Sequence, residues 1–511
     1  MTRNQNIKRN LIYNTTRTVV NLILGFVSRT ILIHYLGVEY LGLNGLFSNI
    51  FTILNLAELG IGSAIVFSMY KPVAENNIEK TKALQNLYKK FYLIIALVVV
   101  GLGLILLPFL DILIKNDVSS DINIYVLYVM YLVNTIFSYF SAHKRSLLFA
   151  YQRNDIENKV VTVVSIVSTL VQILVLVLFR DYYVYYSISI LASLVNCYLI
   201  SRIANKMYPE INGKSEPLDE ETKKEISKNI AALSVHKIGS AVVTSTDNII
   251  ISAFLGTIVL GCYSNYFLLI TYIIMVFSII SNALTGSVGN LIASTDIEYS
   301  YTKYKQINFV FVYLTAFCTI CLMCLFQPFM AIWTGGGVYI LDYSTVILLC
   351  ISFYISRIIT APSIYKECAG IFKQDKWRPL FEAIINLTIS IILVNEIGVN
   401  GVIIGTIISS LVCPFWIGPH MVFKHYFKKS TLNYFKRLFV DIVKFVLALV
   451  PCIIVCNLIP DGGIWLFIAK MASCIVLSNI ILVVLYLPTR EFRECFGILK
   501  TMIKRLKLKN N

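Results

Sequence analysis

The feature that most constrains this chain is a succession of about 14 long apolar segments, each of roughly 20 residues or more. Each segment is long enough to cross a bilayer as an α-helix, because about 20 helical residues span about 30 Å. Only 14% of the residues are charged, and the mean hydropathy is +0.74. Soluble domains have about 25% charged residues. The sequence therefore predicts an all-α, multi-pass membrane protein with about 14 transmembrane helices.

Two kinds of loop alternate between these segments. One kind is short and contains only two basic residues, Lys115 and Arg180, whereas the other kind and the termini hold most of the remaining lysines and arginines. Basic residues concentrate on the cytoplasmic side of membrane proteins. This pattern predicts that both termini and the long loops are cytoplasmic. The net charge of +16 is then a signal of topology and of attraction to anionic lipid, and we expect no nucleic-acid partner.

Two sequence matches at nearly the same spacing indicate an internal repeat. Arg29–Gly42 resembles Asn248–Gly261 at an offset of 219 residues, and Tyr151–Asp155 resembles Ile371–Asp375 at an offset of 220. A duplicated unit of six helices has an even number of crossings, so both copies enter the membrane from the same side. The glycines that the first match aligns are Gly37 with Gly256 and Gly42 with Gly261.

The repeat predicts the division of the chain into domains. Residues 1–207 form an N-terminal six-helix lobe and residues 229–425 a C-terminal six-helix lobe, joined by a polar cytoplasmic linker at residues 208–228. Residues 426–489 form an appended pair, helices 13 and 14. In residues 490–511 apolar side chains recur at helical spacing among basic residues, which is typical of an amphipathic helix on a membrane surface.

The predicted helix at residues 11–36 carries Arg17 and Arg29 on one polar face. Because an arginine at mid-membrane costs about 3 kcal/mol, this face must line water or a polar partner. Further cations lie inside predicted spans at Lys237 and Arg357. We predict that these four cations bind an anion, since guanidinium groups match phosphate oxygens and lysine adds a point charge. The alternatives are structural ion pairs and snorkelling to the membrane surface.

Two acidic residues, Glu58 and Asp247, also fall inside predicted spans. A carboxylate in apolar surroundings readily takes up a proton or a cation, so both are candidates for a site that couples transport to Na⁺ or H⁺. The alternative is that they are structural partners of the cations. The remaining predicted cavity residues are polar, and they are Asn21, Asn44, Asn55 and His236.

Several kinds of chemistry find no support in the sequence. It contains no Walker motif, no His/Glu metal motif and no nucleophile elbow. The twelve cysteines lie in apolar segments without the paired spacing of a disulfide or metal framework, so we interpret them as packing residues. We therefore expect no enzyme activity, no metal site and no cofactor beyond a coupling Na⁺ or H⁺.

Three stretches, with the arrangement of six, six and two helices, carry a family resemblance. They are NTTRTVVNLILGFVSRTILIHYLGVEYLGLNGLFSNI after a basic N-terminus, LAELGIGSAI, and DNIIISAFLGTIVLGCYSNY. With them the chain resembles the Wzx-type polysaccharide flippases of the multidrug/oligosaccharidyl-lipid/polysaccharide (MOP) exporter superfamily.

The resemblance implies two six-helix lobes in a V around a central cavity that opens alternately to each side of the bacterial cytoplasmic membrane. It implies a cargo of undecaprenyl diphosphate carrying a capsule, O-antigen, exopolysaccharide or teichoic-type repeat unit, moved from the inner to the outer leaflet. By placement, Arg17, Arg29, Lys237 and Arg357 would bind the diphosphate. Expected partners are this lipid-linked oligosaccharide, membrane lipids, a polysaccharide polymerase and glycosyltransferases. A cation-coupled multidrug exporter stays the alternative function.

Overall fold

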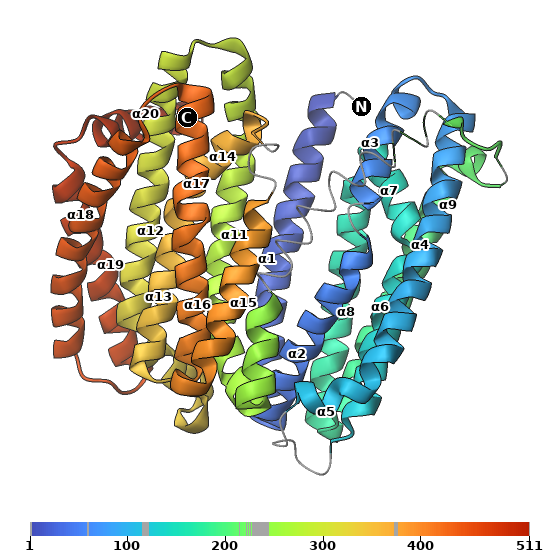
Figure 1. Cartoon of the computed structure of the whole chain (residues 1–511), viewed down its shortest axis with the longest axis horizontal. Helices are drawn as coiled ribbons and strands as arrows, with labels where there is room; N and C mark the ends of the chain where they lie inside the picture. The colour runs from blue at the N-terminus through green and yellow to red at the C-terminus, as the bar shows by residue number, and fades with distance from the viewer. Residues whose placement is uncertain are drawn as a thin grey trace. The chain divides into compact units, whose positions relative to one another are not determined.

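The computed structural model describes residues 3–58, 61–114, 122–213, 215–220, 222, 224, 226, 245–371 and 377–509. Throughout these residues the secondary structure is helical (Figure 1). Twelve helical segments among them are long and apolar enough to cross a membrane. The prediction of an all-α, multi-pass membrane protein is confirmed.

Two of the 14 apolar segments predicted to span the membrane, residues 41–70 and 229–255, are not among these twelve. The span expected at residues 41–70 is interrupted, because α2 (Val38–Leu54) is followed by the 3-10 turn η1 (Asn55–Glu58) and then by α3 (Ile61–Ala74). Neither α2 nor α3 is long enough to qualify alone. Most of the span expected at residues 229–255 lies outside the described residues.

The chain divides into two compact units, residues 1–264 and 265–511. The first contains α2, η1, α3 and the N-terminal turns of α11, together with α1 (Arg3–Leu36), α4 (Ile78–Leu106), η2 (Leu107–Phe109), α5 (Leu110–Leu113), α6 (Ile124–Phe140), α7 (Ala142–Ala150), α8 (Asn154–Phe179), α9 (Tyr182–Met207) and η3 (Pro209–Ile211). The predicted lobe boundaries and the predicted linker stay a prediction.

The second unit contains the rest of α11 and the helices that follow it. They are α11 (Thr257–Ser294), α12 (Ile297–Thr334), η4 (Gly337–Tyr339), α13 (Tyr343–Ile358), α14 (Thr360–Cys368), α15 (Arg378–Ile397), α16 (Val399–Val412), α17 (Pro414–Val422), the π-helical turn η6 (Phe423–Phe427), α18 (Thr431–Leu458), α19 (Ile464–Tyr486) and α20 (Arg490–Lys509).

An aromatic core holds α2, α6 and α9 together in the first unit. Phe47 of α2 contacts the rings of Tyr128 and Tyr131 of α6 at centroid distances of 5.7 and 5.3 Å, and Tyr131 stacks on Tyr186 of α9 at 4.0 Å. The buried hydroxyl of Tyr128 has a partner, since it donates to the Gly103 carbonyl at 3.0 Å. An unpaired buried hydroxyl would cost about 1–3 kcal/mol of folding free energy, and a hydrogen bond of this kind removes that cost of burying a tyrosine.

Corresponding backbone features recur in the two halves of the chain, 218 or 219 residues apart. They are a glycine with positive φ before a helix, an interruption between two consecutive helices, and a residue with positive φ that ends a long helix. The pairs of positions are Gly37 and Gly256, Ser141 and Ile359, and Arg180 and Gly398. These features support the internal repeat.

The repeated glycines also form a close helix contact. A Cβ atom at Gly42 of α2 would lie 1.9 Å from the carbonyl oxygen of Thr257, and a Cβ at Gly261 of α11 would lie 2.4 Å from that of Val38. Val38 and Thr257 are themselves equivalent residues of the repeat. The N-terminal turns of α2 and α11 therefore cross backbone against backbone, which only glycine permits.

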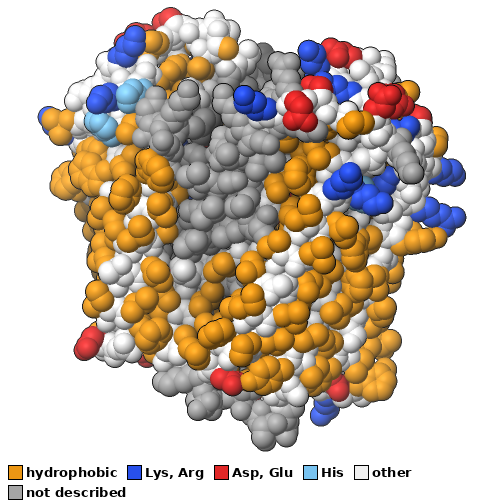
Figure 2. Space-filling view, turned by 45° about the vertical axis from the view of Figure 1, so that its right-hand side comes forward, with side chains coloured by type: hydrophobic (Ala, Val, Ile, Leu, Met, Phe, Trp, Pro, Cys, Tyr) orange, Lys and Arg blue, Asp and Glu red, His pale blue; other side chains and the backbone are white. Residues whose placement is uncertain are grey.

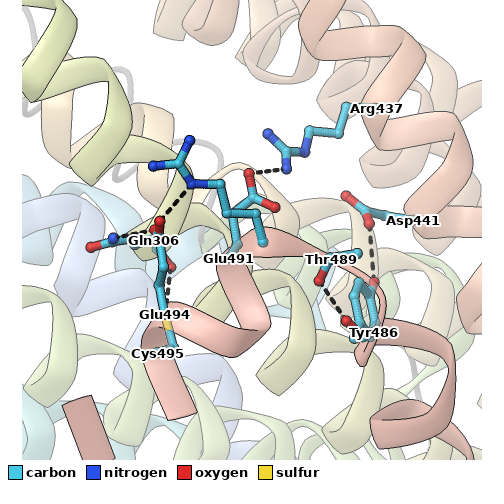
Figure 3. A network of polar contacts seen from close by, with 9 residues as sticks. Gln306, Arg437, Asp441, Tyr486, Thr489, Glu491, Glu494 and Cys495 are labelled. Carbon is cyan, nitrogen blue, oxygen red and sulfur yellow. Dashed lines mark hydrogen bonds and ion pairs between the residues drawn. The ribbon is translucent and has the colours of Figure 1, made fainter. Parts of the chain in front are cut away.

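A polar network fixes α20 to α12 and α18 in the second unit (Figure 3). The side-chain amide of Gln306 on α12 donates to Glu494 of α20 at 2.6 Å, and Arg437 of α18 pairs with Glu491 of α20. Phe492 adds an aromatic contact with Phe309 at 6.0 Å. The predicted C-terminal helix is thus present, and its location on a membrane surface stays a prediction.

The surface of the helices is apolar along their middle. Figure 2 shows hydrophobic side chains there, with lysine, arginine, aspartate and glutamate side chains gathered toward the helix ends. This distribution is typical of helices whose middles contact lipid hydrocarbon.

Candidate functional site

The N-terminal half of α1 directs basic side chains toward α8. Arg9 pairs with Asp155 at 3.2 Å, and two turns further along Arg17 donates to the side-chain oxygen of Asn158 at 3.0 Å. The partner of Arg17 is a neutral amide, so this bond positions the guanidinium without neutralising its charge. The carboxylate–arginine pair of this half of α1 therefore involves Arg9 and Asp155, neither of which is among the predicted cavity residues.

The C-terminal half of α1 has its own polar contacts. Ser28 shares a hydrogen bond of 2.8 Å with the Tyr185 hydroxyl, and Arg29 donates to the Ser264 hydroxyl. Twelve residues separate Arg17 from Arg29, so they lie about 18 Å apart along the helix axis. The exposed Asn21 lies between them. The structure thus places the two arginines at different levels of α1.

Arg357 belongs to the second unit and lies one residue before the end of α13. Its side chain is partly buried, and its Nε donates to Ser356 at 3.3 Å. The interruption between α13 and α14 follows directly, where Thr360 donates to the Arg357 carbonyl at 2.6 Å. Pro362 in the first turn of α14 cannot donate a backbone hydrogen bond, which is consistent with a helix break here.

The remaining predicted residues are placed in part. Lys237 and His236 lie outside the described residues, so the four-cation anion site stays a prediction. Asp247 is partly buried in the helical stretch at residues 245–255. Asn44 of α2 accepts a hydrogen bond from Ser48 at 3.3 Å.

Glu58 lies at the break between α2 and α3. It accepts a hydrogen bond from the Tyr92 hydroxyl of α4, which in turn accepts one from Tyr88 at 3.0 Å. Asn55, one 3-10 turn earlier, accepts a hydrogen bond from Tyr139 of α6. Helices in membrane proteins break where the freed backbone is buried in protein or lines a cavity. The structure therefore brings Asn55 and Glu58 together at this break, and their place in a central cavity between the lobes stays a prediction.

A cavity of about 590 Å³ opens beside Glu58 within the first unit. Its volume lies within the roughly 300–1,000 Å³ of ligand pockets. Figure 1 shows two of its wall helices, α3 and α7, at the end of this unit where the N-terminus is marked. Its aromatic and polar lining residues are Asn55, Glu58, Phe67, Tyr70, Tyr88, Tyr92, Ser138, Tyr139, Arg145, Ser146, Phe149 and Glu157.

This lining combines aromatic rings, hydroxyls and charges of both signs. Tyrosine offers an apolar ring face and a polar edge, carboxylates accept hydrogen bonds, and the guanidinium of Arg145 donates them. The Nε of Arg145 is buried and has no hydrogen-bond partner among the side chains described here. Such a cavity suits a ligand with many hydroxyls, and Arg145 can pair with one anionic group on it.

Sequence reasoning missed Arg145, Glu157 and the tyrosines of this cavity. Arg145 ends the basic run His143-Lys144-Arg145, which looks like the cytoplasmic end of a membrane span. Glu157 lies in the first turn of α8, where acidic residues favour any helix N-terminus. Nothing in the local pattern indicates that these residues share a cavity, because α3, α4, α7 and α8 meet only in the tertiary structure.

Comparison with solved structures shows which fold this chain has. The chain aligns with the lipid II flippase MurJ in an inward closed conformation over 92% of its own length and 98% of that chain, at 17% identity and a TM-score of 0.67. An inward-facing multidrug resistance MATE family transporter of the MOP superfamily aligns over 80% and 94%, at 15% identity and 0.62. A MOP superfamily transporter from Pyrococcus furiosus, described as having a binding pocket of reverse polarity, aligns over 83% and 96%, at 14% identity and 0.53. The chain has the fold of the MOP superfamily.

The family follows from the sequence. Residues 7–285 match the family described as polysaccharide biosynthesis protein. This match covers more than half of the chain, and the chain belongs to this family. No curated protein matches it significantly. The predicted resemblance to MOP superfamily polysaccharide exporters is confirmed, and the structural neighbours named above are a flippase and transporters rather than enzymes.

Proposed function

We propose that this protein moves a lipid-linked oligosaccharide, carried on undecaprenyl diphosphate, from the inner to the outer leaflet of the bacterial cytoplasmic membrane by alternating access. The observation that carries the proposal is the cavity beside Glu58, whose aromatic rings and hydrogen-bonding side chains suit a hydroxyl-rich headgroup and whose Arg145 can pair with one anionic group. The polysaccharide biosynthesis family supports a glycan cargo, and the MOP fold supports transport without covalent chemistry.

The cavity would bind the sugar part of the headgroup. The rings of Tyr70 and Tyr139 would pack on sugar faces, while Asn55 and Glu58 would accept hydrogen bonds from hydroxyls. Arg145 would pair with a phosphate or an acidic sugar. The Tyr88–Tyr92 hydroxyl pair keeps the Glu58 carboxylate in place when the cavity is empty, because it supplies a donor from the protein itself.

The arginines of α1 would act in succession. A diphosphate is much shorter than the roughly 18 Å between Arg17 and Arg29, so one diphosphate meets them one after the other along the path outward. Moving about two negative charges outward across an inside-negative membrane gains about 4.6 kcal/mol per 100 mV. The membrane potential would therefore favour export, and cation return at Glu58 or Asp247 would add to the drive.

A flipping assay tests the proposal. The purified full chain is reconstituted into liposomes that contain a fluorescent lipid-linked oligosaccharide, and its movement between leaflets is followed by a membrane-impermeant quencher. We expect Arg145→Ala and Glu58→Gln to slow flipping at least tenfold. The matched control is Arg202→Ala, which removes an exposed arginine at the same end of the first unit, outside the cavity. Flipping at the wild-type rate in both cavity variants would overturn the proposal.

The multidrug exporter gives a different result in cells. If the protein exports cationic drugs in exchange for a coupling cation, Asp247→Asn abolishes drug resistance while surface glycan display survives. If it is a glycan flippase, depletion of the protein leaves lipid-linked oligosaccharide on the inner leaflet and drug resistance is unchanged. The expected cytoplasmic location of both termini is tested by labelling single cysteines placed near residues 10 and 490 from either side of the membrane.

A further inference from the structure

A second cavity of the first unit has a basic and partly apolar lining. Its volume is about 500 Å³, and it lies between α4, the junction of α6 and α7, and the segment after η3. Asn86, Lys89, Lys90 and Leu93 line it from α4, and their i, i+3, i+4, i+7 spacing places them on one helical face. Phe140 and His143 face them from the α6–α7 junction. No aspartate or glutamate is among its described lining residues, so the charge of the two lysines is not neutralised locally.

The segment after η3 is held against this cavity by side chains. Asn86 donates to the Gly213 carbonyl and to the Ser215 hydroxyl, both at 3.0 Å. Lys144 donates to the side chain of the preceding Asn212 at 2.7 Å. Gly213 and Ser215 therefore form one wall of the cavity, so the site is assembled from three parts of the chain.

Apolar side chains continue the cavity along the surface that faces lipid. Lys89 and Lys90 directly precede the apolar run that begins at Phe91. One turn deeper, Leu93 is 55% exposed, and a further turn deeper Leu97 is 65% exposed. Phe140, on the opposite wall, is 46% exposed. Two cations at the membrane interface followed by exposed apolar side chains match a molecule with an anionic head and a hydrocarbon tail.

We propose that this cavity is a binding site for an anionic phospholipid of the inner leaflet. The phosphate of the headgroup accepts hydrogen bonds from Lys89 and Lys90, and the acyl chains follow Leu93, Leu97 and Phe140 into the bilayer. A free phosphate would use the lysines alone, so the apolar continuation favours a lipid as the source of the phosphate. The proposal goes beyond transport and does not depend on which cargo the protein carries.

A titration with defined lipids tests the site. Phosphatidylglycerol is added to the delipidated full-length protein in neutral detergent, and the bound fraction is measured by native mass spectrometry. We expect Lys89→Ala/Lys90→Ala to weaken binding about thirtyfold, since each lysine near an anionic lipid contributes about 1 kcal/mol. Lys89→Arg/Lys90→Arg keeps the charge and retains binding. Leu93→Asn weakens binding of the lipid without removing a cation.

The controls separate this site from general attraction to a basic protein. Arg202→Ala/Lys206→Ala removes two exposed cations from α9 of the same unit, and binding to this variant should equal that of the wild type. Phosphatidylcholine should not compete, and inorganic phosphate should not displace phosphatidylglycerol. Equal losses in the two double variants would overturn the proposal, as would tight binding of inorganic phosphate alone. Undecaprenyl phosphate that binds at Lys89 and Lys90 while phosphatidylglycerol does not would also overturn it. Because lipid binding is measured without transport, its failure is distinguishable from failure of the flippase proposal.

Discussion

The reciprocal contact between α2 and α11 makes a sharp prediction about stability. Real Cβ atoms stay at least about 3.0 Å from other heavy atoms, whereas a Cβ at Gly42 would lie 1.9 Å from the Thr257 carbonyl oxygen. The obstacle is backbone, which cannot rotate away as a side chain can. In Gly42→Ala the two helices must therefore separate by about 1 Å. Overpacking of this kind costs about 1–3 kcal/mol, and we expect the free energy of unfolding to fall by that amount.

Gly45 provides the matched control on the same helix. A Cβ at Gly45 would meet Ser264 Cβ at 3.8 Å, which is ordinary van der Waals contact. Because alanine is the better helix former, Gly45→Ala should leave stability unchanged or raise it by up to about 1 kcal/mol. The two variants differ in one methyl group at positions three residues apart, so helix propensity cannot explain a difference between them.

The equivalent position of the repeat extends the test. Gly261→Ala should destabilise through its clash with the Val38 carbonyl. Once one added methyl group has separated the helices, a second one requires less further separation. The free energy of unfolding of the double variant should therefore fall by less than the sum of the two single decreases. Unfolding of the purified full chain in mixed micelles, followed by circular dichroism during denaturant titration, measures all four variants. If Gly42→Ala unfolds at the same denaturant concentration as Gly45→Ala, the backbone-to-backbone crossing is refuted.

Three further predictions concern single side chains. Arg357→Ala should reduce surface glycan display at unchanged membrane abundance, and normal display would remove Arg357 from the transport path. Burial raises the pKa of Glu491, but the hydrogen bond and charge of Arg437, a backbone hydrogen bond and the charge of Lys305 together outweigh burial, so the pKa lies below the ordinary 4.5. The ionised carboxylate therefore stabilises the docking of α20, and this contribution is lost as pH falls through the lowered pKa. Hydrogen exchange of α20 should increase over that range, and the increase should be absent from Glu491→Gln. Asp461→Asn should lower the free energy of unfolding by about 1–3 kcal/mol, because it leaves the buried Lys470 ammonium without its charged partner. Denaturant titration measures this change. In a Lys470→Met background, Asp461→Asn should have no effect.

The all-α fold and the repeat could be predicted from sequence because their signals are local. The length of each apolar run determines whether its helix can span the membrane, and the distribution of basic residues in the loops predicts the orientation of that helix. Gly37 and Gly256 were recognisable because each stands between two apolar runs, where the backbone takes a positive φ of 86° or 92°. Glycine adopts such angles at little cost, so the same residue recurs in both halves of the chain.

The break after α2 was not predicted, because a hydropathy window averages over it. Asn55 and Glu58 interrupt an apolar run without a proline, and the run reads as one span of about 30 residues. Their polarity was nevertheless enough to mark both as cavity residues. The sequence around Arg145 did not indicate a cavity residue, since basic residues are common at the cytoplasmic ends of membrane spans. Arg145 lines the same cavity as Glu58 only because α7 packs against α3 and α4 in the folded protein.

Tyr92 and Tyr139 connect the two cavities of the first unit. Each lines both the cavity beside Glu58 and the basic cavity at Lys89 and Lys90, so the wall between the cavities is about one side chain thick. Tyr92 also donates its hydroxyl hydrogen to Glu58. Packed side chains leave little room for independent movement, so a lipid that orders Tyr92 and Tyr139 from one side also restricts them on the other. The proposed lipid and the proposed headgroup would therefore both lie against Tyr92 and Tyr139.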